Sequence, residues 1–408
     1  MPEPPAWRFR KIIKPMFDLP SAHRILKGRV LTCVGDQVIE DGFVEIEDGK
    51  IKAVGEATDL GPNAADVSET AGSILPGLFN NHAHLAWDGI HDLAHQALND
   101  PPELSAYKSA GNMLISLRSG VTTVRDLGMN ATNFMAKQAV EQGIFPGPRL
   151  LITGEALCQT GGHTYWCCRE ATGADGMREA VRDQVRGGAD LIKIMANHDR
   201  LEMTDAELDA VIDEAHRNGL TVTAHATNND AIYRVAKAGL DCIEHGGTMT
   251  DETVQLLLDR SIPIVTTFSA VVMQSKAEIA RQYNIPEWKI AERQRAVAQT
   301  SRYDDLVKAA KAGVPIAFGT DAGSPVVPHD AIVPEMEFMV KLGLVDGNYG
   351  VIRSATVVSA RLNGLAEKLG TLEPGKVADV IVVDGDPLQE LAALGRVQMT
   401  FRDGRQLV

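Results

Sequence analysis

The chain has 408 residues, 44% of them hydrophobic, and a formal net charge of −14. This length and apolar content are sufficient for a large core and for two domains. The acidic balance argues against nucleic acid or an anionic membrane surface as a partner, and no window is long and apolar enough to span a bilayer.

Residues 1–22 are predicted to form an N-terminal extension, which either packs on the body of the protein or is disordered. The segment mixes aromatic and basic residues but has no continuous apolar core, so we do not interpret it as a secretory signal. The whole chain has five cysteines, an odd number that includes the adjacent pair Cys167 and Cys168. This pattern does not look like a disulfide framework and favours a reducing, cytoplasmic setting.

Strand patterns occur at both ends of the chain. Asp48-Gly49 is predicted to be a hairpin turn, because both residues tolerate a positive φ. The strands predicted at the two ends are residues 29–34, 42–47, 51–54, 378–383, 397–401 and 407–408. We therefore predict that residues 23–72 and 366–408 pair into one small β-sandwich domain.

Between these ends, helices repeatedly close with a basic residue and a glycine, and a mostly apolar strand follows. A basic residue in the last turn complements the helix dipole, and glycine takes the left-handed C-terminal cap. Thr204 to Glu207 has the pattern of a capping box. The strands predicted here are residues 74–79, 121–124, 149–152, 188–196, 220–225, 240–245, 262–267 and 314–319.

Eight strands, most of them separated by helices, predict an α/β fold in which residues 73–365 form a (β/α)₈ TIM barrel. An open, doubly wound sheet is the alternative fold. It has less support, because no glycine-rich phosphate-binding turn follows the first strand.

Chemically active side chains stand at the ends of several of these strands, where barrel enzymes place their sites. A single histidine at a strand end is usually just a polar group with a hydrogen-bond partner. For the whole set, this explanation would require four histidines, a lysine and an aspartate to lie at one end of a barrel with no shared role. Two of the histidines are spaced by two and therefore point to one face of their strand. The set consists of His82, His84, Lys193, His225, His245 and Asp321.

Lys193 lies within an apolar run, where a buried lysine is costly unless it is paired, neutralised or modified. It could point to solvent from an edge strand, or be neutral and hydrogen-bonded in a core. Alternatively, it has captured CO₂ as a carbamate, a carboxylate-like group that can bridge two metal ions. The histidines and the aspartate on the other strands favour the carbamate.

Imidazole and carboxylate ligands suit two divalent ions, with zinc first and manganese or cobalt also fitting. We predict one ion on His82, His84 and Asp321, and a second on His225 and His245, with carboxylated Lys193 as the bridge. A hydroxide that bridges the two ions would be the nucleophile. Asp321 would act as general acid and base, since it can take the proton of the water and give it to the leaving nitrogen.

This constellation resembles the amidohydrolase superfamily, which has His-x-His on strand one, lysine on strand four, histidines on strands five and six, and aspartate on strand eight. The resemblance covers nearly the whole chain from about Gly28 and includes the stretches Leu75-Pro76-Gly77-Leu78, Ile243-Glu244-His245-Gly246 and 369–379. It implies a binuclear hydrolase that cleaves an amide-type C–N bond in an N-acyl amino acid, dipeptide, carbamate or aryl amide.

Within that superfamily, the chain looks like the branch of Xaa-Pro and Xaa-Arg dipeptidases, carbamate and phenylurea hydrolases and ochratoxin-type amidases. Gly161-Gly162-His163 resembles a loop of that branch whose histidine polarises the substrate carbonyl, which implies a catalytic role for His163. The dipeptidases have a tyrosine two residues after the strand-five histidine, where this chain has Thr227. This departure leaves room for amides or carbamates without a free carboxylate.

Aromatic residues on the loops are predicted to contact an apolar part of the substrate, or else to cap the barrel. The predicted substrate-binding residues are Trp87, His163, Tyr165, Trp166, Thr227 and His329, with Glu335 also close to the pocket. Arg169 and Arg200 lie on loops after strands three and four, where they could bind an acid.

Two other functions compete with amide hydrolysis. A mononuclear deaminase of the same superfamily would usually lack Lys193 and carry a glutamate at position 228, which here is Asn228. A non-catalytic scaffold would be expected to have lost some of the ligands. The expected partners are a small amide or peptide substrate and further copies of the chain in a homo-oligomer, with no nucleic acid and no membrane.

Overall fold

Strands from both ends of the chain meet in one sheet. The structure, a computed structural model, describes residues 23–61, 67–128 and 130–408, so the predicted extension of residues 1–22 lies outside the described part. The end sheet has seven strands in the order β17-β16-β15-β4-β1-β2-β3, and only the β1–β4 pairing is parallel. Its strands are β1 (Arg24–Leu31), β2 (Val38–Glu47), β3 (Lys50–Glu56), β4 (Val67–Pro76), β15 (Val380–Val383), β16 (Val397–Arg402) and β17 (Arg405–Gln406).

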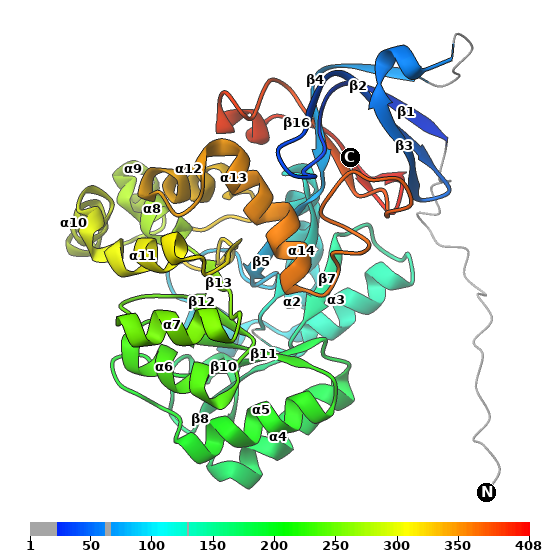
Figure 1. The fold of residues 1–408 in the computed structure, drawn as a ribbon. Helices are drawn as coiled ribbons and strands as arrows, with labels where there is room; N and C mark the ends of the chain where they lie inside the picture. The colour runs from blue at the N-terminus through cyan, green and yellow to red at the C-terminus, as the bar shows by residue number, and fades with distance from the viewer. Residues whose placement is uncertain (1–22, 62–66, 129) are drawn as a thin grey trace, which may run out of the picture.

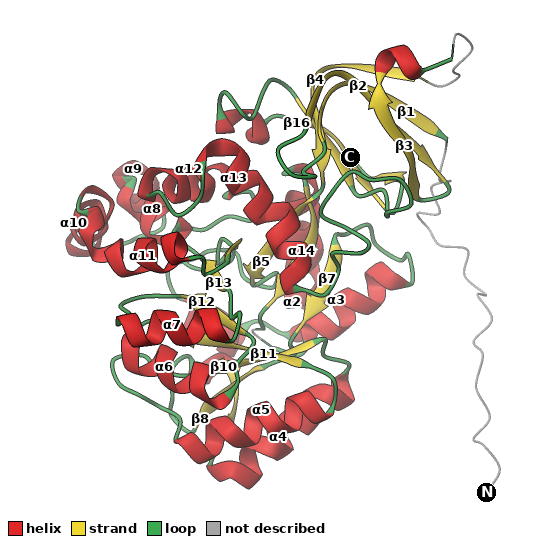
Figure 2. Cartoon of the chain, in the orientation of Figure 1, coloured by secondary structure: helices red, strands yellow, loops and turns green. Residues whose placement is uncertain are grey.

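The middle of the chain is an α/β assembly with two parallel sheets (Figures 1 and 2). One sheet has the order β5-β6-β7 and the other β14-β13-β12-β11-β10-β8-β9. The strands are β5 (Leu78–Ala83), β6 (Val121–Asp126), β7 (Arg149–Ile152), β8 (Ala156–Gln159), β9 (Cys168–Ala171), β10 (Leu191–Met195), β11 (Thr221–Ala226), β12 (Cys242–His245), β13 (Ile264–Thr266) and β14 (Ile316–Phe318).

Helices follow most of these strands and pack on the outside of the sheets (Figure 2). In chain order they are α1 (Leu93–Asn99), α2 (Pro102–Arg118), α3 (Thr132–Glu141), α4 (Gly173–Gly187), α5 (Asp205–Arg217), α6 (Asn229–Ala238), α7 (Asp251–Asp259), α8 (Ser269–Ser275), α9 (Ala277–Gln282), α10 (Glu287–Ala298), α11 (Asp304–Ala312), α12 (Ile332–Leu342), α13 (Gly347–Arg353) and α14 (Ser359–Leu362). Among the described residues, no helix has the length and apolar character to cross a bilayer.

The predicted helix ends are confirmed. Gly188, Gly239 and Gly313 close α4, α6 and α11 in the left-handed conformation, with φ of 95°, 102° and 108°. Thr204 and Glu207 form the reciprocal capping box at the start of α5. These caps end each helix sharply, so that the next strand starts at a defined point.

The prediction of one strand over residues 74–79 is wrong, because the chain changes sheet at Gly77. β4 ends at Pro76, pairing with Val380 of β15, and β5 begins at Leu78, pairing with Val121 of β6. A Cβ atom at position 77 would lie 2.2 Å from the Thr122 hydroxyl, so only glycine fits this close crossing. The domain boundary expected before residue 73 therefore falls inside β4.

The two parallel sheets are joined by backbone contacts on both sides. Ala83, the last residue of β5, forms a parallel bridge with Ala322, just beyond β14. On the other side, the amide of Asp190 donates to the carbonyl of Ile152 at the end of β7, at 2.8 Å. These contacts bring the carboxyl ends of strands far apart in the sequence to one side of the molecule.

Candidate metal centre

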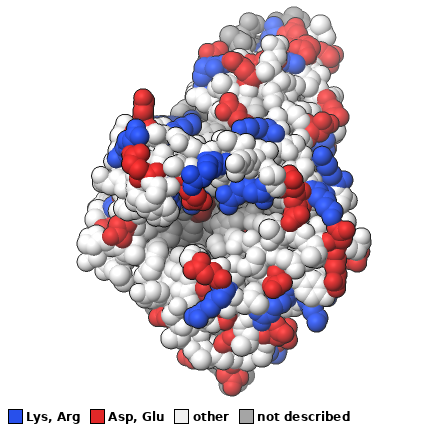
Figure 3. Space-filling view, turned by 90° about the vertical axis from the view of Figure 1, so that its left-hand side faces the viewer, with Lys and Arg blue, Asp and Glu red and all other residues white. Residues whose placement is uncertain are grey.

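A cavity of about 210 Å³ lies at the carboxyl ends of the parallel strands. The face that carries α8 to α11 is hollowed, and charged side chains lie above and below the hollow (Figure 3). The structure brings the six residues singled out in the sequence to the wall of this one cavity: His82, His84, Lys193, His225, His245 and Asp321. Each comes from a strand or from the first residues after it.

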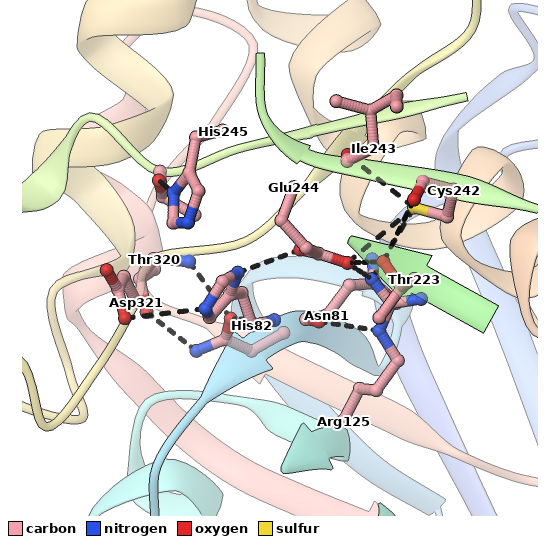
Figure 4. Close-up of polar contacts among 12 residues, drawn as sticks. Asn81, His82, Arg125, Thr223, Cys242, Ile243, Glu244, His245, Thr320 and Asp321 are labelled. Carbon is pink, nitrogen blue, oxygen red and sulfur yellow. Dashed lines mark hydrogen bonds and ion pairs between the residues drawn. The ribbon is translucent and has the colours of Figure 1, made fainter. Parts of the chain in front are cut away.

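His82, His245 and Asp321 form the tightest part of the cluster (Figure 4). One ligand atom from each lies within 4.8 Å of the other two. His245 and Asp321 have positive φ angles of 69° and 58°, which are uncommon for residues other than glycine. The amide of Asp321 donates to the carbonyl of His82 at 2.8 Å, which helps to hold this strained turn in place.

Three of the imidazoles are oriented by contacts at Nδ1. His84 Nδ1 donates to the carbonyl of Gly128 at 2.5 Å, His82 Nδ1 donates to the Glu244 carboxylate at 2.8 Å, and His245 Nδ1 lies 2.6 Å from the Thr267 hydroxyl. A neutral imidazole that donates from Nδ1 carries its lone pair on Nε2. This arrangement is typical of histidines that bind a metal through Nε2.

The Nε2 atoms of His82 and His84 face the carboxylate of Asp321 at 3.5 and 3.2 Å. Lone pairs of neutral imidazoles and a carboxylate repel one another unless a proton or a metal cation lies between them. Burial lowers the pKa of His84, but the hydrogen bond and charge of Asp321 outweigh burial and raise it. The donor set therefore fits a divalent cation at this point.

The pKa shifts of the other groups also favour the protonation states that bind a metal cation. Burial lowers the pKa of Lys193, and it lowers the pKa of His225 and His245 well below the ordinary value. Burial would raise the pKa of Asp321, but the charges of His82 and His84 hold it well below its usual range. Neutral imidazoles and an ionised carboxylate are the forms that bind metals.

Glu244 and Arg125 lie under His82, and the sequence analysis gave neither residue a role. Glu244 is completely buried, and its carboxylate accepts hydrogen bonds from Arg125, Thr223 and His82 (Figure 4). Burial would raise the pKa of Glu244, but Arg125 and His82 hold it well below the usual range. One signal in the sequence was available: a glutamate that alternates with Cys242 in an apolar strand points to the same buried face.

His163 is in the cavity wall, in a stack of imidazole rings. Its ring lies parallel to that of His198, with centroids 4.5 Å apart, and 4.6 Å from that of His225. Burial and the charge of His198 lower the pKa of His163 to about 4, so the ring is neutral at pH 7. A neutral imidazole can donate one hydrogen bond to a substrate carbonyl.

The other predicted substrate-binding residues divide into two groups. Trp87 and Trp166 line the cavity, with ring centroids 5.7 Å apart. The remaining three are outside its wall. Tyr165 is 54% exposed, Thr227 accepts a hydrogen bond from Asn197, and His329 is buried with its Nε2 3.1 Å from the Trp87 carbonyl.

Glu335 is also outside the cavity wall, and it fixes the start of α8. Its buried carboxylate accepts hydrogen bonds from the Ser269 amide at 2.5 Å and the Ser269 hydroxyl at 2.8 Å. Burial raises its pKa to about 7, so the folded protein holds this proton at pH values where the unfolded chain has lost it.

This shift predicts a pH-dependent contribution to stability. Glu335 stabilises the fold fully below the pKa of the unfolded chain, and the contribution is lost as pH rises through about 7. We expect Glu335→Gln to raise the free energy of unfolding relative to wild type by on the order of 3 kcal/mol at pH 8 and by much less at pH 4.5. Chemical denaturation at both pH values measures the difference, and a difference that does not change with pH would contradict the assignment.

Comparison with known proteins shows what this chain is similar to in sequence and in fold. Residues 73–407 match the sequence model of the amidohydrolase family. Ochratoxinase from Aspergillus niger is 27% identical over 356 residues, which cover 78% of this chain and 71% of that protein. The crystal structure of an Xaa-Pro dipeptidase with bound methionine in the active site superposes with a TM-score of 0.83 at 26% identity, covering 94% of this chain and 99% of that one. The crystal structure of an amidohydrolase gives a TM-score of 0.81 at 32% identity, covering 95% and 99%.

Proposed function

Since this chain belongs to the amidohydrolase family, we propose that it is a binuclear metal-dependent hydrolase that cleaves an amide-type C–N bond. One observation carries the proposal: four histidines, a lysine and an aspartate from five strands line a single cavity. The ochratoxinase and the Xaa-Pro dipeptidase among the similar proteins support the same class of reaction.

The ligands would divide between two ions, with zinc as the first choice and manganese or cobalt as alternatives. His82, His84 and Asp321 would hold one ion, and His225 and His245 the other. When bound, such ions lower the pKa of a water molecule and polarise a carbonyl group.

Lys193 would bridge the two ions as a carbamate. Its side chain is only 1% exposed, and the lowered pKa favours the neutral amine. The neutral amine nitrogen attacks the carbon of CO₂ and loses a proton, which leaves an anionic carboxylate in place of the neutral amine. A buried anion next to several imidazoles is stabilised only when cations are present, so carbamate formation and metal binding support each other.

The remaining chemistry would fall to two side chains of the cavity. Asp321, ionised and partly buried beside His82 and His84, accepts the proton of the attacking water and hands it to the leaving nitrogen. His163, neutral at pH 7, donates a hydrogen bond to the substrate carbonyl oxygen as negative charge develops there.

The wall of the cavity favours a neutral, apolar substrate. Away from the ligand set it includes the apolar side chains of Trp87, Trp166, Leu93 and Met195, and no arginine is among the described residues that line it. Arg169, on a neighbouring strand, lies 3.4 Å from Asp183 and is already engaged. We propose aryl amides or carbamates without a free carboxylate as substrates, ahead of N-acyl amino acids and dipeptides.

A matched pair of substrates tests this preference. We expect kcat/KM for an N-acyl aromatic amino acid methylamide to exceed that of the corresponding free acid by about tenfold or more, because the acid would place a carboxylate against apolar walls. Cleavage of the acyl–nitrogen bond is followed for both compounds by chromatography. A faster reaction of the free acid would point to a carboxylate-binding residue and to the dipeptidase type of substrate.

Metal content tests the proposed centre itself. Elemental analysis of protein purified without chelator should give about two divalent ions per chain, and their removal should abolish hydrolysis until metal and bicarbonate are restored. A single ion per chain would favour the mononuclear deaminase. Absence of metal after reconstitution would favour a scaffold.

We also propose that the two parallel sheets together form a (β/α)₈ barrel, and that the end sheet folds into a sandwich around its own core. The backbone bond between Asp190 and Ile152 and the bridge between Ala83 and Ala322 support closure of the barrel. The end sheet has its own cluster of buried apolar residues, including Leu26, Ile74 and Val382, which supports the sandwich. With β4 kept whole, the domains would then be residues 23–76 with 366–408, and 77–365, so the boundary expected before residue 73 moves to Gly77.

Two further expectations belong to the same proposal. Exposed apolar residues on α1 and α2, among them Leu98 and Tyr107 at 67% and 79% exposure, support a homo-oligomer, which light scattering would detect. All five cysteines are free, which supports a reducing, cytoplasmic location.

A further inference from the structure

Three of the five cysteines gather behind the cavity wall and have no part in the proposed hydrolysis. Cys158 is in β8, Cys168 is the first residue of β9, and Cys167 ends the short helical turn Tyr165–Cys167 between them. β8 and β9 are parallel neighbours, with Cys168 opposite Ala156. Cys168 packs against the buried cluster that contains Cys158 and also against the one that contains Cys167, and it therefore lies at the centre of the three cysteines.

The surroundings of Cys168 are polar on one side and border the cavity through its neighbours. Its sulfur is 3.4 Å from the Thr164 hydroxyl and 3.9 Å from the His163 carbonyl. Cys158 is fully buried, whereas Cys168 is only half-buried. Thr164 and Cys167 line the cavity itself, so a small molecule that enters the cavity reaches this cluster.

The five thiols differ in chemical character. Cys168 is the only one of the five that is not fully buried. The neighbouring thiols of Cys158 and Cys167 also hold the pKa of Cys168 well below that of a free thiol and outweigh the effect of burial. Burial raises the pKa of Cys33 and Cys242 to about 12, so these two stay protonated. Because the thiolate is the nucleophile and must be reached by its oxidant, Cys168 is the reactive member of the set.

We propose that Cys168 is a site of oxidation by hydroperoxides and that Cys158 resolves the oxidised sulfur as a disulfide. The sulfur of Cys168 attacks one oxygen of the hydroperoxide, the O–O bond breaks, and water or an alcohol leaves with Cys168 as a sulfenic acid. The thiol of Cys158 then attacks that sulfur, the S–S bond forms, and water leaves. Two thiols lose two electrons in total, and the hydroperoxide gains them.

Cys158 is a better resolving thiol than Cys167 for a geometric reason. A bond between Cys167 and Cys168 would close a small ring across one peptide bond, which strains the backbone. Cys158 is on the adjacent strand, two residues beyond the residue opposite Cys168, and the two cysteines belong to the same packed cluster. The new bond would draw Cys168 away from Thr164, whose hydroxyl also donates to the His163 carbonyl at 2.7 Å. Oxidation would thus disturb the turn that carries His163.

Peptide mapping of the full-length protein tests the proposal without any assay of hydrolysis. The protein is treated with hydrogen peroxide, remaining thiols are alkylated after unfolding, and chymotrypsin is used because cleavage after Trp166 separates Cys158 from Cys167 and Cys168. We expect a linked pair of peptides that dithiothreitol releases, with the loss of two alkylatable thiols per chain. Cys33 and Cys242 act as internal controls and should remain fully alkylatable.

Single variants identify the reacting pair. The linked peptides should persist in Cys167→Ser and disappear in Cys168→Ser, and Cys158→Ser should accumulate a sulfenic acid at Cys168 that a dione reagent traps. In the untreated protein, iodoacetamide should modify Cys168 about tenfold faster than Cys158. A bond confined to Cys167 and Cys168, a link that survives Cys168→Ser, or oxidation of Cys33 before Cys168 would each overturn the proposal.

Discussion

Asp321→Asn should lower kcat by about three orders of magnitude while the protein stays folded. An amide cannot take a proton from the attacking water at neutral pH, and it removes the negative charge that faces His82 and His84. The substitution suits the backbone, because Asp321 has a φ of 58° and asparagine tolerates this left-handed conformation better than most residues. Steady-state kinetics on the substrate identified by the matched pair gives the effect.

Asp330→Asn is the matched control for this variant. It makes the same chemical change at an exposed position nine residues further along the chain. Its kcat should equal that of wild type, and both variants should unfold at similar denaturant concentrations. If Asp321→Asn retained more than about a tenth of the wild-type kcat, Asp321 could not be the proton acceptor.

Lys193→Ala should remove the bridge between the proposed ions and reduce both metal content and turnover. We expect fewer than about two ions per chain and a decrease of several orders of magnitude in kcat/KM, since the second pair of histidines would lose its shared anionic ligand. Elemental analysis reports the metal content independently of activity. Added propionate should restore part of the metal content and part of the turnover, because a small carboxylate can occupy the space left by the buried side chain.

Isotope labelling separates a carbamate from an ordinary buried lysine. Protein loaded with metal in ¹³C-bicarbonate should show a carbamate carbon by NMR, and Lys193→Ala should lack that signal. Lys237→Ala, which removes an exposed lysine of α6, is the control and should keep the signal, the metal and the activity. Wild-type protein with metal but without the carbamate signal would rule out the bridge.

The fold and the proposed ligands could be predicted largely because they depend on local rules. Glycine caps, a capping box and apolar strand runs mark the α/β units, and His82, His84 and His225 were placed by the strands that carry them. The carboxyl ends of parallel strands lie together regardless of the sequence of the loops, so the convergence of these residues follows from topology.

What could not be predicted depends on contacts between distant segments. The pairing of Arg125 with Glu244 joins two strands through a buried charge pair that no sequence spacing reveals. The short strands β8 and β9 lack a periodic pattern, so the meeting of Cys158 with Cys168 was not foreseen. At Gly77, the fit against Thr122 decides where one sheet stops and the other begins.

The sheet that joins the two ends of the chain has a consequence for the order of events during synthesis. β4 leaves the ribosome early, but its partner β15 begins only at Val380. Until then, one edge of β4 has unpaired amides and carbonyls, and such edges attract other chains. The α/β units between them can fold as they emerge, since their contacts are mostly local. The nascent protein therefore acquires its cavity before it seals this edge, which makes the interval before β15 emerges the period when protection by a chaperone matters most.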